Sequence, residues 1–229
     1  MKLTPEQFAK YFDHTILKAD ATKETILKVC DECIENGFKM IAINSSPVKL
    51  CKEKLAGTGV NVGAAISFPL GQTTIDVKAF ETKTAIEEGC DEIDYVINLR
   101  EVKAKNWAYI QKEMETIVEI CRTANVTSKV IYETCYLSDE EVIEISKIAK
   151  VVKPDFVKTS TGFGTDGSKV HHVKLMKSIV QNDVKVKASG GVRDLETALA
   201  MIAAGVERIG SSSSVKILED YKNYYNQLT

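Results

Sequence analysis

The chain has 229 residues, of which 44% are hydrophobic and 27% charged, so it can bury one sizeable core, and we expect a single domain over 1–229. The formal charge of -2 argues against nucleic acid or an anionic membrane as a partner and favours small-molecule chemistry. The stretch MKLTPEQFAKYF has no apolar signal-peptide core, and no later segment approaches the roughly 20 apolar residues of a membrane span. These features predict a cytoplasmic protein.

A short helix is predicted before the first strand, because Thr4 is a typical N-cap, Pro5 suits the first helical position and Gln7 completes a capping box. Eight short runs rich in β-branched residues follow, and each gap between consecutive runs is long enough for a helix. The predicted strands are DHTIL (13–17), KMIAIN (39–44), VGAAISF (62–68), EIDYVIN (92–98), KVIYET (129–134), DFVKTS (155–160), VKVKAS (184–189) and ERIGS (207–211).

Strands that alternate with helices predict a parallel sheet built from βαβ units. Eight such units in 229 residues fit a (β/α)8 TIM barrel, with the short N-terminal helix as an addition. An open doubly wound sheet is the alternative. A second capping box begins at Ser138, and Gly37, Gly89 and Gly205 each follow a helical pattern just before a strand, where a helix C-terminus is expected.

Six cysteines are scattered along the chain, which indicates reduced thiols rather than a disulfide framework. Cys30 and Cys33 form a CxxC, but they fit a helical pattern and have no second metal-binding pair. His171 and His172 are adjacent in a predicted helix, where neighbouring side chains point about 100° apart and do not easily share a metal. We therefore expect a solvated helix face there, and neither a metal nor a cofactor in the protein.

Two lysines are predicted at the catalytic end of the barrel, where the carboxyl ends of the strands meet. Lys158 ends the sixth strand and Lys187 lies at the same level on the seventh, one βα unit further along the chain. On the fourth strand, the period-2 rule places Asp94 on the inward face with Val96. An acid and two amines are therefore expected to face one another.

Two buried ammonium groups close together disfavour each other's charge, and burial disfavours charge further, so the pKa of at least one lysine should fall. A neutral amine can attack a carbonyl and form a Schiff base, whose iminium accepts electrons from a neighbouring carbon–carbon bond. The carboxylate and the second lysine would then transfer protons. The alternative is a structural Lys–Asp ion pair inside the barrel, because such pairs also perturb pKa values.

Two glycine- and serine-rich loops predict the anion that the substrate carries. Ser189-Gly190-Gly191 follows the seventh strand, and Gly210 with four serines follows the eighth and opens the last helix. The loops after strands seven and eight, together with a helix N-terminus, are the usual phosphate site of a barrel. Gly162 would add a backbone amide on the same rim, so we expect a phosphorylated substrate.

Six segments in this order, spread over nearly the whole chain, resemble deoxyribose-phosphate aldolases, which are class I aldolases: DHTIL, SFPLG, DEIDYVIN, DFVKTSTGFGT, VKASGGVRD and RIGSSSS. The resemblance implies reversible cleavage of 2-deoxy-D-ribose 5-phosphate to D-glyceraldehyde 3-phosphate and acetaldehyde, within deoxyribonucleoside breakdown. It implies no cofactor, and a small phosphosugar rather than nucleic acid or membrane as the partner. The assembly that we expect is a homodimer.

The resemblance also implies residue roles. Lys158 forms the Schiff base, Lys187 perturbs its pKa and relays protons, and Asp94 completes the relay. The matching substrate-binding positions are Asp13, Thr15, Gly162, Gly190, Gly191, Ser212 and Ser213.

Four positions depart from the pattern of the family. Asp166 stands where a glycine is frequent and would place a carboxylate near the phosphate rim, and Ser214 replaces a glycine after the serine pair. Arg100 replaces a common glycine, and Ala42 stands where cysteine is common. None of the four removes a catalytic group.

Other functions remain open at this point. An isomerase of the same fold would use a carboxylate or cysteine base as its main group, and a zinc-dependent aldolase would need several histidines at strand ends. A non-catalytic phosphosugar-binding protein would keep the two loops but has no use for two buried lysines. The lysine pair favours the Schiff-base enzyme.

Overall fold

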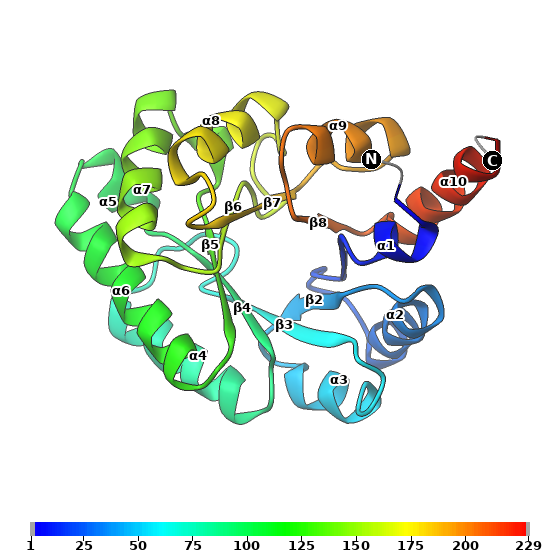
Figure 1. The fold of residues 1–229 in the computed structure, drawn as a ribbon. Helices are drawn as coiled ribbons and strands as arrows, with labels where there is room; N and C mark the ends of the chain where they lie inside the picture. Colours follow the sequence, from blue (N-terminus) through cyan, green and yellow to red (C-terminus); the bar gives the residue numbers. More distant parts are fainter. Residues whose placement is uncertain (1–2, 228–229) are drawn as a thin grey trace.

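The computed structural model describes residues 3–227, in which eight strands form an inner ring surrounded by helices (Figure 1). The strands fall within one to three residues of the predicted runs. They are β1 (Phe12–Thr15), β2 (Met40–Asn44), β3 (Asn61–Ile66), β4 (Glu92–Val96), β5 (Thr127–Ile131), β6 (Phe156–Lys158), β7 (Lys185–Ser189) and β8 (Arg208–Ser211).

A helix follows every strand, and the short helix predicted before β1 is present. The helices are α1 (Pro5–Ala9), α2 (Lys23–Asn36), α3 (Val48–Lys54), α4 (Ile75–Glu87), α5 (Leu99–Lys103), α6 (Trp107–Thr123), the 3-10 turn η1 (Thr134–Tyr136), α7 (Asp139–Val152), α8 (Val170–Val180), α9 (Leu195–Ala203) and α10 (Ser214–Gln227).

All neighbouring strands are parallel, and the sheet is closed because β1 pairs with both β2 and β8. This closure confirms the predicted (β/α)8 barrel and excludes the open doubly wound sheet. The register places Asp94 opposite Lys129, and Lys158 opposite Lys187. Residues paired in register on neighbouring strands point to the same face of the sheet, and here that face is the barrel interior.

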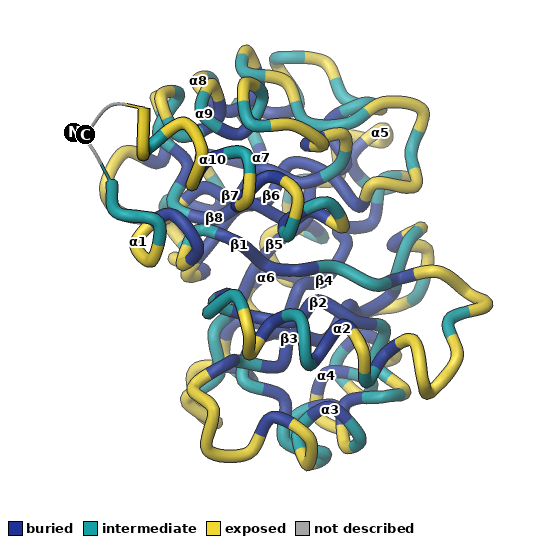
Figure 2. The backbone as a smooth tube through the Cα atoms, turned by 90° about the vertical axis from the view of Figure 1, so that its right-hand side faces the viewer, coloured by how far each residue is buried: buried dark blue, intermediate teal, exposed yellow. Residues whose placement is uncertain are grey.

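The hydrophobic core lies between the outer face of the barrel and the helices. Ile93 and Tyr95 alternate with the charged residues of β4 and are fully buried, as the period-2 rule requires. They meet a helical layer that includes the buried Met114 and Ile117 of α6. Figure 2 shows the same division, with buried backbone in the strands and exposed backbone on the outer helices and loops.

The predicted helix termini are confirmed. Thr4 and Ser138 each make the expected capping box, with Gln7 and Glu141 respectively. Gly37 ends α2 in the left-handed region at φ 66°, where a residue without a Cβ has no steric penalty. The first helix lies beside the last, so that segments near the two termini pack together.

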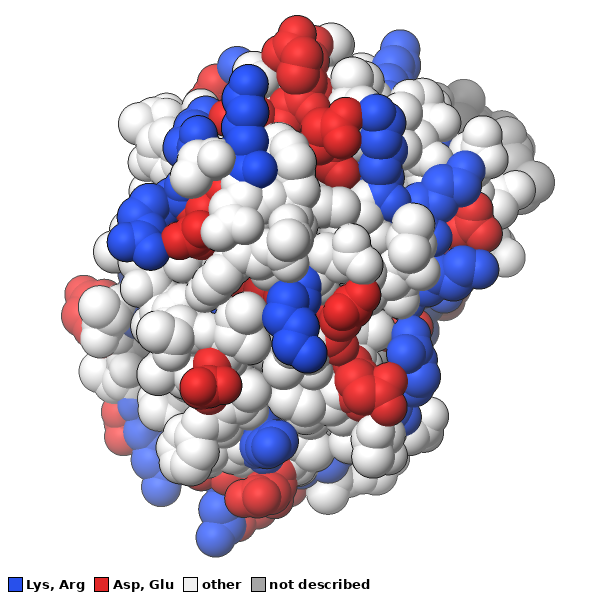
Figure 3. Space-filling view, turned by 90° about the vertical axis from the view of Figure 1, so that its left-hand side faces the viewer, with Lys and Arg blue, Asp and Glu red and all other residues white. Residues whose placement is uncertain are grey.

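The surface and the thiols agree with a protein that binds a small molecule. Lysine and arginine are interspersed with aspartate and glutamate on the face shown in Figure 3. All six cysteines are free, and Cys30 and Cys33 are buried on α2, as predicted for two helix positions. None of the helices within residues 3–227 is long and apolar enough to cross a membrane.

Candidate active site

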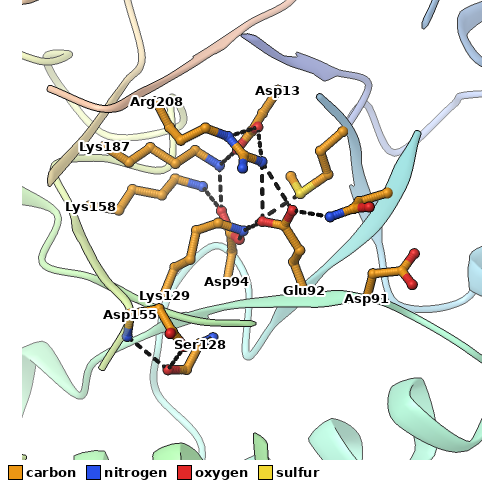
Figure 4. Close-up of polar contacts among 12 residues, drawn as sticks. Asp13, Asp91, Glu92, Asp94, Ser128, Lys129, Asp155, Lys158, Lys187 and Arg208 are labelled. Carbon is orange, nitrogen blue, oxygen red and sulfur yellow. Dashed lines mark hydrogen bonds and ion pairs between the residues drawn. The ribbon is translucent and has the colours of Figure 1, made fainter. Parts of the chain in front are cut away.

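Seven charged side chains converge inside the barrel (Figure 4). They project inward from six strands, and none is more than 6% exposed. Desolvating a charge costs several kcal/mol per ion, so such groups persist only in close pairs. The seven residues, called the barrel network below, are Asp13, Glu92, Asp94, Lys129, Lys158, Lys187 and Arg208.

Asp94 lies at the centre of the barrel network. Its Oδ2 atom accepts hydrogen bonds from Lys158 Nζ at 2.8 Å and from Lys187 Nζ at 2.7 Å. Its Oδ1 atom accepts one from Lys129 Nζ at 2.6 Å. The predicted meeting of one acid with two amines is therefore confirmed, and the two amines share a single carboxylate oxygen.

A lower tier supports this arrangement. Asp13 Oδ2 lies 2.5 Å from Lys187 Nζ, and the other oxygen of Asp13 pairs with Arg208. Glu92 bridges Arg208 and Lys129, with its Oε2 atom 2.6 Å from Lys129 Nζ. The sequence analysis assigned no role to Glu92, Lys129 or Arg208. A signal was present for Glu92, because it lies two residues before Asp94 and so shares its inward face.

The charges of the barrel network do not balance when every group is ionised. Within residues 3–227, the ion pairs join four cations to three carboxylates. One cation is thus in excess in an environment that disfavours charge, and loss of one proton makes the network neutral.

Lys158 is the group that loses the proton most readily. Burial lowers the pKa of Lys158, Asp94 raises it and Lys187 lowers it again, for a net pKa of about 8. The pKa of Asp94 shifts in favour of the charged form. Burial raises the pKa of Asp94, but attraction to the three lysines outweighs burial and holds that pKa well below its usual value. At neutral pH, Asp94 is therefore ionised and a usable fraction of Lys158 is a free amine.

A pocket of about 510 Å³ opens above the barrel network, and Lys158 is the network residue that lines it. The pocket also reaches five of the predicted substrate-binding positions. Those five are Thr15, Gly162, Gly190, Gly191 and Ser212. The structure thus brings the proposed nucleophile and most of the proposed binding residues to one cavity.

The remaining predicted residues lie around the pocket rather than in its wall. Asp94 contacts both Lys158 and Lys187, and the buried Asp13 contacts Lys187. Ser213 is not among the lining residues, and its N–H donates to Ser211 Oγ at 2.9 Å.

Two glycine turns approach closely at the predicted anion-binding rim. Gly162 and Gly190 have φ values of 90° and 80°, a region that disfavours side chains. A Cβ on Gly190 would lie 3.2 Å from the Cα of Gly162. Ser212 lies opposite, two residues before α10 begins. Backbone amides and a helix N-terminus are therefore available to an anion at this end of the pocket.

Glu133 holds the loop that follows Lys158. Its carboxylate accepts a hydrogen bond from Thr161 N at 3.1 Å and another from Thr161 Oγ1. The residue is buried and has a left-handed φ of 55°, which is uncommon for a side chain of this size. The sequence analysis missed Glu133, because no local pattern predicts a glutamate in this conformation.

A second buried ion pair lies outside the barrel, between α4 and α6, and fixes the end of β4. Lys78 Nζ donates to Glu113 Oε1 at 2.7 Å and to the carbonyl oxygen of Val96 at 2.6 Å. Glu113 Oε2 accepts from Asn98 N at 3.1 Å. Because Val96 is two residues beyond Asp94, these contacts anchor the strand that carries the central carboxylate.

Two departures from the family pattern have little effect on the pocket. Asp166 is exposed and pairs with Lys169 at 2.8 Å, and it does not line the pocket. Ser214 is buried, and its hydroxyl donates to the carbonyl oxygen of Ser211 at 2.9 Å.

The prediction of a solvated helix face at the adjacent histidines is wrong for His172. His172 is only 9% exposed, and its ring centroid lies 5.4 Å from that of His171. The rings converge because both meet the first turn of α7, where Asp139 lies. His14 is elsewhere, on β1, where its Nε2 atom lies 2.7 Å from Glu32.

Ala42 supplies a test of the pocket wall, because it lines the pocket from β2. Enals formed by acetaldehyde self-condensation add to thiolates, so Ala42→Cys should lose activity several-fold faster in concentrated acetaldehyde than the parent. Ala42→Ser is the matched control, since it has similar size and no thiol. Cys135 is the one cysteine that is not buried. If the parent is inactivated as fast as Ala42→Cys, and Cys135→Ser prevents that loss, the thiol that reacts is Cys135.

Comparison with known proteins places this geometry among aldolases. The sequence profile described as DeoC/LacD family aldolase matches residues 7–218. The chain is 53% identical over 222 residues to the deoxyribose-phosphate aldolase of Lactobacillus acidophilus, covering 97% of this chain and 94% of that protein. It is 47% identical over 219 residues to the deoxyribose-phosphate aldolase of Thermococcus kodakarensis, covering 95% and 98%.

A solved structure shows the same fold. The chain superimposes on the deoxyribose phosphate aldolase of Aeropyrum pernix with a TM-score of 0.89 and 31% identity, covering 96% of this chain and 93% of that one. That protein is described as having a unique tetrameric structure. Similarity in sequence and in fold therefore extends over nearly the whole barrel.

Proposed function

The chain belongs to the DeoC/LacD family of aldolases, and we propose that it reversibly cleaves 2-deoxy-D-ribose 5-phosphate to D-glyceraldehyde 3-phosphate and acetaldehyde through a Schiff base. The observation that carries the proposal is the buried Lys158, which has a pKa of about 8 and lies at the floor of the pocket. A neutral lysine amine that opens into a pocket is the group that class I aldolase chemistry requires.

In the proposed reaction, the Lys158 amine adds to the aldehyde carbon of the open-chain sugar, and loss of water gives an iminium. A base removes the proton of the C3 hydroxyl, the C2–C3 bond breaks, and its electron pair moves into the iminium to form an enamine. Glyceraldehyde 3-phosphate leaves. Protonation of the enamine carbon and addition of water then release acetaldehyde and restore the amine.

Lys187 and Asp94 are suited to move the protons. Lys158 Nζ and Lys187 Nζ both donate to Asp94 Oδ2, so a proton has a short path between the two amines. Because Lys187 stands beside Lys158 as a second cation, it also lowers the pKa of the nucleophile. We assign to Asp13 the support of Lys187 from below, since its carboxylate is buried beneath that amine.

The substrate phosphate would bind at the rim formed by Gly162, Gly190, Gly191 and the segment before α10. Their backbone amides and the Ser212 hydroxyl offer donors to a phosphate, and the N-terminus of α10 attracts its negative charge. Ser213 would contribute from the same turn. Thr15 lines the same pocket from the end of β1 and would contact a sugar hydroxyl.

Retro-aldol turnover tests the proposed function directly. Purified protein is incubated with 2-deoxyribose 5-phosphate, and glyceraldehyde 3-phosphate is measured through a coupled dehydrogenase. We expect steady turnover that persists in excess chelator, because the proposed steps use only side chains of the chain. No turnover would favour a non-catalytic phosphosugar-binding protein, and turnover lost in chelator would favour a metal-dependent aldolase.

Ser212→Asp tests the phosphate site. The new carboxylate would repel the substrate phosphate, so KM for deoxyribose 5-phosphate should rise by about 10-fold or more. Ser212→Asn is the matched control, because asparagine has the shape of aspartate without its charge. KM for unphosphorylated deoxyribose should change little. Equal losses on both sugars would place the phosphate elsewhere.

We propose a homodimer as the assembly and the cytoplasm as the location. Val77 and Phe80 lie one turn apart on α4 and are exposed, as is Leu70 before it, and a contiguous apolar patch often marks an interface. Six free cysteines suit a reducing compartment. Light scattering would distinguish a dimer from a tetramer like that of the Aeropyrum pernix relative.

A further inference from the structure

We propose that Asp139, His171 and His172 form a binding site for a borderline transition-metal ion such as Zn²⁺, between the first turns of α7 and α8. One carboxylate and two imidazole nitrogens are brought together there, with all three ligand atoms within 4.8 Å of one another. Imidazole and carboxylate are common zinc ligands, and a three-residue set leaves a position for water.

The distances fit an ion with a small adjustment. His171 Nε2 lies 2.7 Å from Asp139 Oδ2, and His172 Nε2 lies 3.9 Å from Asp139 Oδ1. Ligands at zinc-bond lengths in a tetrahedral arrangement lie about 3.3 Å apart. One pair is therefore about half an ångström too close and the other about as much too far. The two contacts use different oxygens of Asp139, so binding an ion requires the exposed Asp139 and His171 side chains to turn.

Burial and exposure are divided as a metal site requires. His172 is packed into the protein, so its ring is already held in place. The His171 and Asp139 side chains are 61% and 46% exposed, so an ion can enter from solvent and keep bound water. Fixing one ligand in advance reduces the entropy that binding costs.

Neighbouring charges set the strength of the site. The positive ends of α7 and α8 oppose a cation. Lys169 also opposes it, but that amine is paired with Asp166. Asp139 supplies the opposite charge. With three ligands and two opposing helix ends, we expect a Kd on the order of 1 to 10 µM for Zn²⁺, weaker than four-ligand structural sites.

The site is independent of the proposed aldolase reaction. None of its three residues lines the pocket or belongs to the barrel network. Its two histidines lie in the first turn of α8, just after the loop 159–169 that leads from Lys158. A bound ion would therefore join that end of the loop to α7. Binding can be measured without reference to turnover.

Calorimetric titration of the chelator-treated protein with Zn²⁺ tests the site. We expect one ion per chain, and at least a 10-fold loss of affinity in His171→Ala and in Asp139→Asn. Both residues are exposed, so these variants should fold. Lys169→Ala is the matched control on the same helix turn, and its affinity should be kept or increased. Unchanged affinity in His171→Ala, or no binding by the parent at millimolar Zn²⁺, would overturn the proposal.

Cysteine is the main competing ligand, and Cys135 lies nearby on η1 as the one thiol that is not buried. Cys135→Ser should therefore bind Zn²⁺ as the parent does. With Co²⁺ as the probe, the visible absorption of the ion should appear without a thiolate charge-transfer band. Loss of binding in Cys135→Ser, or the presence of that band, would assign the ion to the thiol and refute the site.

Discussion

Reduction with borohydride in the presence of acetaldehyde should leave a stable ethyl group on Lys158 and none on Lys187. The iminium forms only on an amine that is unprotonated and open to the pocket, and Lys158 is the network amine that lines it. Peptide mapping by mass spectrometry should find the label in the fragment containing Asp155–Lys158. A label on Lys187 would reverse the proposed roles, and an unlabelled protein would end the Schiff-base mechanism.

Lys158→Arg extends this test to turnover. The guanidinium keeps the positive charge next to Asp94, but it does not lose its proton and forms no imine. Trapping should disappear and retro-aldol turnover should fall by about 10⁴-fold or more, as when other covalent nucleophiles are removed. Lys129→Arg is the matched control, because Lys129 contacts the same carboxylate but does not line the pocket. That variant should still be labelled on Lys158.

The pH dependence of trapping follows from the lowered pKa of Lys158. Burial, aided by Lys187, favours the neutral amine, and the resulting pKa is about 8. The amine is the reactive form, so the trapping rate should rise with pH and level off above about 8. An ordinary lysine would continue to gain reactivity to above pH 10. A profile that is still rising at pH 10 would contradict the lowered pKa.

The barrel itself was predictable because its signals are local and repeated. Short β-branched runs mark the strands, capping boxes at Thr4 and Ser138 mark two helix starts, and glycines such as Gly37 mark helix ends. Closure was preferred because eight compact βα units fit a barrel, but only the pairing of β1 with β8 excludes an open sheet. The equal level of Lys158 and Lys187 also followed, because one βα unit separates them and the register is regular.

The lower tier of the barrel network was not predictable in the same way. Arg208 lies at the start of β8, where an arginine is usually exposed, and here it pairs with Asp13 and Glu92 across the barrel. Those contacts depend on how far each strand is shifted along the barrel axis. The convergence of His171 and His172 on Asp139 likewise depends on the packing of α7 against α8, which no single segment encodes.

The charge balance of the whole barrel network bears on the role of Lys187. With four cations and three carboxylates, removal of any one cation leaves a balanced set in which Lys158 can stay protonated. Lys187 and Lys129 both lower the pKa of Lys158. Replacing either lysine by a neutral residue should therefore raise the pKa of Lys158. Of the two, only Lys187 shares Asp94 Oδ2 with the nucleophile.

Lys187→Leu and Lys129→Leu together separate the pKa effect from the proton relay. In both variants the trapping profile should move to higher pH, because a cation that disfavours the charged form of Lys158 has gone. At a pH above the new pKa, Lys129→Leu should recover most of its turnover. Lys187→Leu should remain about 10²-fold to 10⁴-fold below the parent, which is the usual contribution of a positioned acid–base group. The residual label should still be on Lys158.

The comparison stays informative if the variants are destabilised. Lys187→Leu leaves Asp13 paired with Arg208 and leaves Asp94 paired with Lys129 and Lys158, so neither carboxylate is stranded. Circular dichroism checks that both variants are folded at the assay temperature. Full recovery of Lys187→Leu at high pH would reduce Lys187 to an electrostatic role. A deficit in Lys129→Leu as deep as that in Lys187→Leu would show that turnover depends on the balance of the whole network rather than on a relay through one amine.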